Sequence, residues 1–243
     1  MPDAFGRPRS AQWLELVDGT ALVESAQAIP LDPARLDPRT ASSRGLGELL
    51  ASAARSGARA LVVALGGTAN MDGGEGMLDV IRELPVPTRA ACDVSTRLVD
   101  APRLFGPQKG ADEALIAELE QRFGSHPLSD VPGSGAAGGL GAALASLGAG
   151  LVPGAPLVLE LVGFDPRGYD LVVTGEGTVD ETTWEGKAPA AVLDACARVG
   201  VRCALFGGRV LSGDALPLSG DVSQAYEDLV RLGERLGRDP ATR

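Results

Sequence analysis

Uninterrupted apolar runs that lead directly into glycine constrain this chain more than any other feature. Residues 60–65 read ALVVAL and are followed at once by Gly66 and Gly67. Such a run is typical of a strand buried on both faces of a parallel sheet. Open α/β sheets bind ligands at the carboxyl ends of their strands. We therefore expect a glycine loop at the ligand-binding edge of a sheet.

Helical patterns alternate with further strand-like runs along the whole chain. The expected strands cover 14–17 and 20–23 (a hairpin across Asp18-Gly19), 60–65, 88–94, 169–174 and 202–206. The expected helices cover 45–56, a short segment within 74–83, 112–123, 136–147, 188–199 and 221–236, with Ser42 or Ser43 as the cap of the first. The strand at 169–174 is expected to be buried and to end in a loop at Gly175–Gly177. This alternation predicts an α/β fold with mainly parallel sheets.

Prolines gather between residues 153 and 166, where we expect a domain boundary. The expected domains are a glycine-loop α/β domain over 1–160 and a second α/β portion over 161–243.

Composition excludes several classes of function. The chain has 32 acidic and 22 basic residues, the opposite of the balance that phosphate contacts in a nucleic-acid binder require. No apolar run reaches the length of about 18 residues that a membrane helix needs. One histidine and three scattered cysteines argue against a zinc site and indicate a reduced compartment, which we take as cytoplasmic. We therefore expect neither nucleic acid nor membrane as a partner.

Lysine and asparagine are rare, and the few that occur lie in glycine-rich motifs. The chain has only Lys109 (in GPQKGA), Lys187 (in EGKAP) and Asn70 (in GGTANMDGGEG). Lysine is a compact point charge that arginine cannot always replace between phosphate oxygens. For any one of these three residues, the simpler alternative is that it remains by chance at a surface position without a function. Their coincidence with glycine favours binding of an anion.

Carboxylates follow several of the expected strands beside glycine. Asp72 follows one of them, Asp93 lies at the end of another, and Glu176 with Asp180 follow a third. Glycine loops form nests of N–H groups for anions, and a carboxylate beside such a nest calls for a cation between them, as when Mg²⁺ bridges carboxylates and phosphate oxygens. A free carboxylate can also accept the proton of a substrate hydroxyl. The pattern therefore favours phosphoryl transfer, whereas a single strand end of this kind is more often only a turn.

Five motifs, in order, resemble those of the bacterial glycerate kinases of the first type. They are LGGTANMDGGEGM at 65–77, ACDV at 91–94, FGPQKGA at 105–111, PGSGAAGGLGA at 132–142, and TGEG with Asp180 and GKAP in 170–189. The resemblance spans roughly residues 10–240. It implies transfer of a phosphoryl group from ATP to D-glycerate with Mg²⁺, and two α/β domains, of which the C-terminal one here would be an incomplete Rossmann-like half.

The residue chemistry and the resemblance together define the expected site. The expected catalytic residues are Asp72, Asp93, Lys109 and Lys187, and Asp72 and Asp93 are also the candidate Mg²⁺ ligands. The expected substrate- and phosphate-binding residues are Gly66, Gly67, Thr68, Asn70, Gly73, Gly74, Gly133, Gly135, Glu176 and Asp180. The sequence does not separate the individual roles of these carboxylates and lysines.

The chain also departs from the family pattern. It begins where the family's later hairpin region would be, without the PDSFK-like loop, and its DxQT glutamine is Thr182. Two alternatives to a glycerate kinase therefore stay open. One is a truncated, non-catalytic homologue that binds a small anion or a partner. The other is one part of a split kinase, completed by a chain with the N-terminal motifs. We expect this chain alone to be a poor kinase, with glycerate and nucleotide as ligands and either a homo-oligomer or the complementing N-terminal chain as protein partner.

Overall fold

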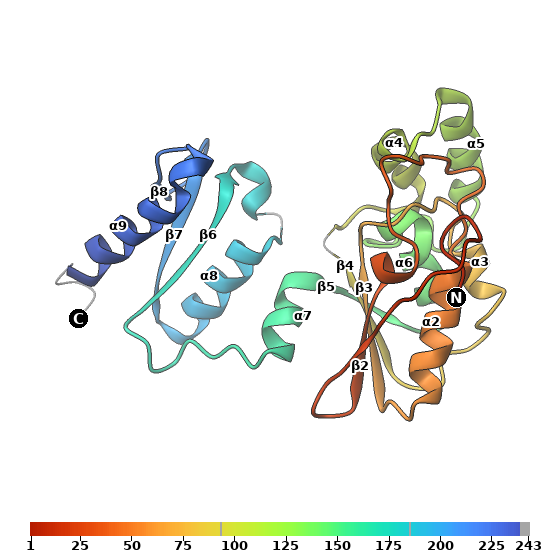
Figure 1. Ribbon diagram of the computed structural model, residues 1–243, viewed down its shortest axis with the longest axis horizontal. Coiled ribbons are helices and arrows are strands. Elements are labelled where there is room, and N and C mark those ends of the chain that lie inside the picture. The colour runs from red at the N-terminus through yellow and green to blue at the C-terminus, as the bar shows by residue number, and fades with distance from the viewer. Residues whose placement is uncertain (93, 185, 239–243) are drawn as a thin grey trace. The chain divides into compact units, whose positions relative to one another are not determined.

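The protein consists of two compact units, each built on its own sheet (Figure 1). The computed structural model describes residues 1–92, 94–184 and 186–238. The first unit covers Met1–Gly154 and the second begins at Ala155. Both sheets are mainly parallel and are connected through helices, which confirms the predicted α/β class.

The sheet of the first unit has five strands in the order in which they occur along the chain. These are β1 (Leu14–Glu15), β2 (Thr20–Glu24), β3 (Ala60–Leu65), β4 (Thr88–Cys92) and β5 (Gly150–Pro153). The predicted hairpin is confirmed, because β1 runs antiparallel to β2 with Leu14 opposite Leu22. All the other pairs are parallel. The short strand β5 was not predicted, since its four residues include glycine and proline.

The helices of the first unit follow most of the predicted segments. They are α1 (Ser25–Ala28), α2 (Arg44–Arg55), α3 (Glu75–Leu78), α4 (Ala101–Phe105), α5 (Glu113–Gly124) and α6 (Ala136–Ser146), with the 3-10 turns η1 (Leu98–Asp100) and η2 (Pro107–Lys109). The start of α5 is fixed by Asp112, whose carboxylate accepts a hydrogen bond of 2.7 Å from the Leu115 amide.

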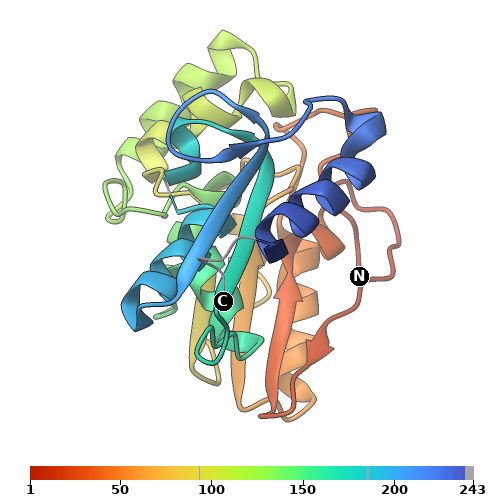
Figure 2. The same cartoon turned by 90° about the vertical axis from the view of Figure 1, so that its left-hand side faces the viewer.

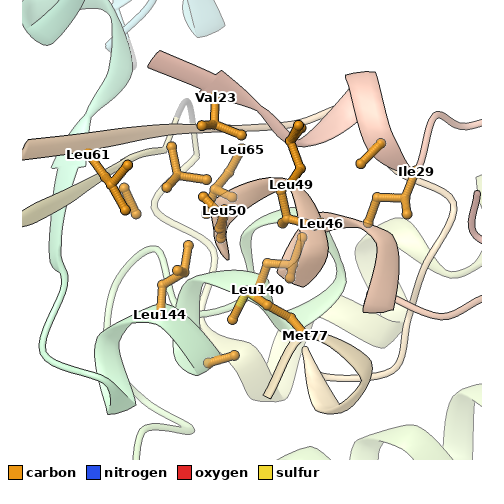
Figure 3. Close-up of a cluster of buried hydrophobic side chains, with 14 of the residues drawn as sticks. Val23, Ile29, Leu46, Leu49, Leu50, Leu61, Leu65, Met77, Leu140 and Leu144 are labelled. Carbon is orange, nitrogen blue, oxygen red and sulfur yellow. The ribbon is translucent and has the colours of Figure 1, made fainter. Parts of the chain in front are cut away.

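Leucines of α2 and α6 pack together on one face of the first sheet (Figure 3). The side chains that meet there are Val23, Leu61 and Leu65 of the sheet, Leu46, Leu49 and Leu50 of α2, and Leu140 and Leu144 of α6. Each fully buried leucine stabilises the fold by about 1.5–3 kcal/mol relative to an exposed one. This packing holds the carboxyl end of β3 and the start of α6 in fixed positions.

The second unit has a sheet of three parallel strands, ordered β6 (Leu171–Val179), β7 (Arg202–Val210) and β8 (Leu216–Pro217). Its helical segments are α7 (Gly154–Leu161, of which Gly154 belongs to the first unit), η3 (Glu181–Trp184), α8 (Ala188–Val199), η4 (Val222–Gln224) and α9 (Ala225–Arg238). Figure 2 shows β6 and β7 side by side, with α8 and α9 on opposite faces of this sheet.

The prediction that a strand ends in a loop at Gly175–Gly177 is wrong. Strand β6 continues to Val179, with Gly175 paired to Phe206 and Glu176 to Gly207. A Cβ atom on Gly175 would lie 2.6 Å from the Phe206 ring, so glycine is what allows the two strands to stay paired here. Nor is β6 buried on both faces, since Val173 is 45% exposed.

The closing helix also differs from its prediction. Asp221 caps the 3-10 turn η4 by accepting a bond of 2.9 Å from the Ser223 amide, so α9 begins only at Ala225. In residues 1–92, 94–184 and 186–238, no helix combines the length and the apolar character that a membrane crossing requires.

Candidate functional site

A pocket of about 230 Å³ lies at the carboxyl end of β3, within the first unit. The glycine loop that follows β3 forms one wall, and the start of α6 forms another. The lining residues are Leu31, Leu65, Gly66, Gly67, Thr68, Val94, Phe105, Gln108, Lys109, Ala136, Ala137 and Gly138. The pocket therefore lies where the apolar run into glycine predicted a ligand site.

Lys109 is the one ionisable residue among the described residues that line this pocket. It lies in η2, is only 4% exposed, and donates a hydrogen bond of 2.8 Å from Nζ to the Asn70 carbonyl oxygen. Burial lowers the pKa of Lys109 to about 8, and the charge of Asp72 opposes that shift. Because an ammonium has three donors, the group retains the capacity to bind an anion in the pocket.

Two other polar groups close to Lys109 are buried without a hydrogen-bond partner in the described protein, Thr68 Oγ1 and Asn70 Oδ1. Asn70 is held in place by its Nδ2 atom, which donates to Asp72 Oδ1 at 2.9 Å and to the Ala137 carbonyl at 3.2 Å. A buried polar group without a partner costs about 1–3 kcal/mol. Thr68 lines the pocket, so a polar ligand there would satisfy its hydroxyl.

The loop over 66–76 and the segment over 133–141 meet backbone to backbone. Gly73 donates from its amide to the Gly138 carbonyl at 3.0 Å. Gly138 has φ +69°, and a Cβ there would lie 2.0 Å from the Asn70 carbonyl oxygen. A Cβ on Gly74 would lie 2.3 Å from that of Ala143. Glycine is therefore required for the close approach of the two segments that build the pocket.

Asp72 is surrounded by hydrogen-bond donors. Its Oδ2 atom accepts from the Ser43 amide (2.7 Å), the Ser43 hydroxyl (2.8 Å) and the Gly76 amide (3.2 Å). Its Oδ1 atom accepts from Asn70 Nδ2 (2.9 Å) and the Gly74 amide (3.0 Å). A carboxylate has about four lone-pair sites, so these five bonds occupy it. The geometry favours a carboxylate that holds the loop rather than a ligand for Mg²⁺ or a proton acceptor.

Ser43 is a residue of this site that sequence reasoning missed. We expected it or Ser42 to cap α2, and Ser43 does occupy the N-cap position, but its side chain makes no cap bond. Its hydroxyl is buried, donates to Asp72 and accepts from the Met77 amide at 2.9 Å. The partners lie 29 and 34 residues along the chain, so no local pattern could have identified this role.

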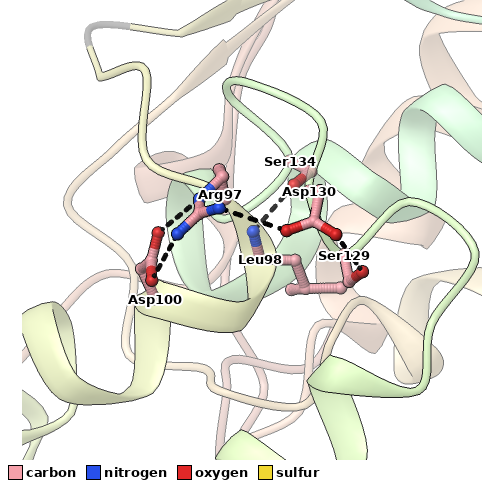
Figure 4. A network of polar contacts seen from close by, with 6 residues as sticks. All are labelled: Arg97, Leu98, Asp100, Ser129, Asp130 and Ser134. Carbon is pink, nitrogen blue, oxygen red and sulfur yellow. Dashed lines mark hydrogen bonds and ion pairs between the residues drawn. The ribbon is translucent and has the colours of Figure 1, made fainter.

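Gly133 and Gly135 do not line the pocket; of this segment, Ala136, Ala137 and Gly138 do. The Gly135 amide donates to the Thr96 carbonyl at 3.0 Å. Ser134, between them, accepts from the Leu98 amide at 2.8 Å (Figure 4).

Arg97 also stabilises the segment that leads into α6, through two ion pairs. Its guanidinium lies 2.7 Å from Asp100 and 3.2 Å from Asp130 (Figure 4). The segment that leads into α6 is therefore anchored to η1 by hydrogen bonds and ion pairs.

The second unit brings together the other three predicted residues. Lys187 Nζ lies 3.7 Å from Glu176 Oε2 and 3.9 Å from Asp180 Oδ1. The Thr183 hydroxyl donates to Glu176 Oε1, and the Thr182 amide and hydroxyl donate to Asp180 Oδ1 at 2.9 and 2.6 Å. The side-chain hydrogen bond from Thr182 is the main cause that lowers the pKa of Asp180.

A larger pocket, of about 540 Å³, begins at Glu176 in the same unit. It lies between the ends of β6 and β7 and the start of α9. Its lining residues are Glu176, Gly177, Thr178, Phe206, Gly208, Arg209, Leu218, Gly220, Asp221, Val222, Ala225, Asp228 and Leu229. The carboxylate–lysine cluster thus borders a pocket of the size that small-molecule ligands occupy, about 300–1,000 Å³.

Two groups of predicted residues therefore emerge, one in each unit. Asp93, predicted as catalytic and as an Mg²⁺ ligand, lies outside the described residues. Within the described ranges, no three His, Cys, Asp or Glu side chains gather as a metal site. Mg²⁺ can be held by one or two carboxylates with phosphate oxygens and water. Glu176 and Asp180 fit that requirement, whereas the occupied carboxylate of Asp72 does not.

Comparisons with known proteins agree on one family. The sequence matches the profile of the Glycerate kinase family over residues 1–84 and 82–232. It is 36% identical to Glycerate 2-kinase of Escherichia coli K12 over 240 residues, which covers 77% of this chain and 63% of that protein. It is 31% identical to Glycerate kinase of Bacillus subtilis 168, over 98% of this chain and 79% of that protein.

A solved structure supports the same conclusion. A crystal structure from Salmonella typhimurium LT2, provisionally named glycerate kinase 2, superimposes with a TM-score of 0.77 at 26% identity, over 96% of this chain and 82% of that one. The chain spans 60–64% of the length of several curated relatives that it matches. With the ordered motifs and the two-sheet fold, these matches show that the chain belongs to the Glycerate kinase family.

Proposed function

We propose that this protein takes part in the ATP-dependent phosphorylation of D-glycerate. The observation that carries the proposal is the nearly buried ammonium of Lys109 in a small pocket of the first unit. A pocket of about 230 Å³ suits a small organic acid, whereas a nucleotide needs more room. The names of the relatives supply the identity of that acid.

In this proposal the carboxylate of D-glycerate binds in the first unit. The Lys109 ammonium supplies a charge-assisted hydrogen bond, and the unpartnered Thr68 hydroxyl supplies a second polar contact. The glycine loop at Gly66 and Gly67 lets the ligand approach the backbone. Together these groups orient the acid so that a hydroxyl is presented for transfer, and orientation is a large part of phosphoryl-transfer catalysis.

The nucleotide binds in the second unit, in the pocket that Glu176 borders. Glu176 and Asp180 would hold Mg²⁺, which supplies neutralisation of phosphate charge when it is bound. Lys187 is 43% exposed between them, so its ammonium is available to phosphate oxygens as well as to the two carboxylates.

Two separate binding measurements test the proposal, one for each unit. By calorimetry at pH 7, Lys109→Met should weaken D-glycerate binding by at least about tenfold, since a hydrogen bond to a charged group contributes about 1.5–3 kcal/mol. The same variant should leave Mg-ATP binding unchanged, and Glu176→Gln should show the reverse pattern. A coupled assay of glycerate-dependent ADP release then measures the transfer itself. Unaltered glycerate binding by Lys109→Met would contradict the proposal.

A further inference from the structure

Asp72 and Lys109 are connected through one residue, Asn70. Asn70 Nδ2 donates to Asp72 Oδ1 at 2.9 Å, and the Asn70 carbonyl accepts from Lys109 Nζ at 2.8 Å. We propose that Asp72 is a positioning residue: it is the counter-ion that, through Asn70, fixes the Lys109 ammonium in the pocket wall and keeps it cationic. The inference rests on the proposed function only for what Lys109 binds.

The environment of Lys109 makes a counter-ion necessary. An ammonium that leaves water loses its hydration, and in an apolar site it gives up its proton unless a negative charge is near. The other described residues that line the pocket are apolar or neutral. Among the described residues, Asp72 is the one ionisable group whose charge acts on Lys109, and it raises a pKa that burial has lowered to about 8.

The hydrogen bonds of Asp72 suit this role better than contact with the substrate. Donors from Ser43, Gly74 and Gly76 hold the carboxylate in one orientation. The same bonds fix the loop that carries Asn70, and with it the Asn70 carbonyl that accepts the hydrogen bond from Lys109. A negative charge held in this way acts on the ligand through Lys109, since its own lone pairs are occupied.

The composition of the chain offers a direct measurement. Lys109 and Lys187 are its only lysines, so protein labelled with ¹³C at lysine Cε gives two NMR signals, and Lys187→Arg assigns them. In the wild-type protein the Lys109 signal should titrate near pH 8. In Asp72→Asn the pKa of Lys109 should fall by about one unit, because a charge that raises it is gone. This readout needs no ligand and no turnover.

Matched variants separate the charge of Asp72 from its hydrogen bonds. Ser43→Ala removes a donor to Asp72 but keeps the carboxylate, so the pKa of Lys109 should move by less than about 0.3. Asp79→Asn removes an exposed carboxylate of the same unit and should leave that pKa unchanged. An unmoved Lys109 titration in Asp72→Asn would overturn the inference.

A double variant keeps the inference testable if Asp72→Asn does not fold. Lys109→Met removes the cation that lacks a counter-ion, so it should raise the stability of Asp72→Asn by more than it changes the stability of the wild type. If Asp72 acted only as an acceptor for the loop, Lys109→Met would change the stability of both backgrounds equally, which would overturn the proposal. Failure of the proposed function would give a different result. Lys109→Met would bind D-glycerate normally, while the pKa of Lys109 measured by NMR would still fall in Asp72→Asn.

Discussion

Ser43 donates two hydrogen bonds to Oδ2 of Asp72, one from its backbone amide at 2.7 Å and one from its hydroxyl at 2.8 Å. The same hydroxyl accepts a bond of 2.9 Å from the amide of Met77. One buried side chain therefore connects the start of α2, the glycine loop and α3. The loop that forms a wall of the pocket is held by a residue that does not line it.

Replacing Ser43 by alanine should destabilise the fold. The Met77 amide loses its acceptor and Asp72 loses a donor, and each buried unpaired group costs about 1–3 kcal/mol. Urea unfolding at pH 7 measures the change. Ser125→Ala is the matched control, because the Ser125 hydroxyl is exposed and donates to the Arg122 carbonyl; its effect should stay below about 0.5 kcal/mol. Equal effects of the two substitutions would contradict the role given to Ser43.

Gly138→Ala should be among the most harmful single changes in the first unit. The new Cβ would lie 2.0 Å from the Asn70 carbonyl, at a residue with φ +69°. Overpacking and backbone strain together predict a loss of about 2–4 kcal/mol. Gly148→Ala has a similar φ, +91°, but open space around it, so it should lose only about 1 kcal/mol. Thermal unfolding of the two variants measures how much of the lost stability comes from the steric clash and how much from the strained backbone conformation.

Stability should increase with pH in a window set by Lys109. The pKa of Lys109 is about 8 in the folded protein, below its ordinary value of 10.5. Between these values the unfolded chain binds more protons, so the free energy of unfolding rises with pH and then levels off. The total change is about 3 kcal/mol. Urea unfolding from pH 7 to 11 should show this rise in the wild-type protein, relative to a Lys109→Met variant that lacks it. Parallel curves for the two proteins would disprove the prediction.

Glu176→Gln should make nucleotide binding less dependent on magnesium. The Glu176 carboxylate lies beside Asp180 and Lys187 at the edge of the larger pocket. Loss of one carboxylate charge should weaken Mg-ATP binding by about tenfold, or about 1.4 kcal/mol, with a smaller effect on ATP in the presence of a chelator. Glu181→Gln changes an exposed neighbour and is the control. If both variants bound Mg-ATP as the wild type does, the metal would have to be held elsewhere.

The parts of the fold that depend on local pattern could be predicted from the sequence. Strand β3 and helix α5 follow from an apolar run and from apolar residues at helical spacing. The pocket at Gly66 and Gly67 follows from the rule that parallel strands present ligands at their carboxyl ends.

The remainder depends on contacts between distant segments. Gly175 reads locally as a loop residue, but the Phe206 ring packs where its side chain would be, so β6 continues. The sequence around Asp72 is equally compatible with a metal ligand and with a carboxylate that holds the loop. The choice depends on Ser43, which the sequence places 29 residues earlier and the fold brings to 2.8 Å.

The interlocked glycine segments also have a consequence for how this unit folds. Asn70 and Ala137, which are joined by a hydrogen bond, are separated by 67 residues of chain, and Asn70 and Lys109 by 39. Closing loops of this length costs entropy before any contact compensates for it, and chains rich in such contacts fold slowly. The pocket therefore forms only when these distant segments of the chain have come together.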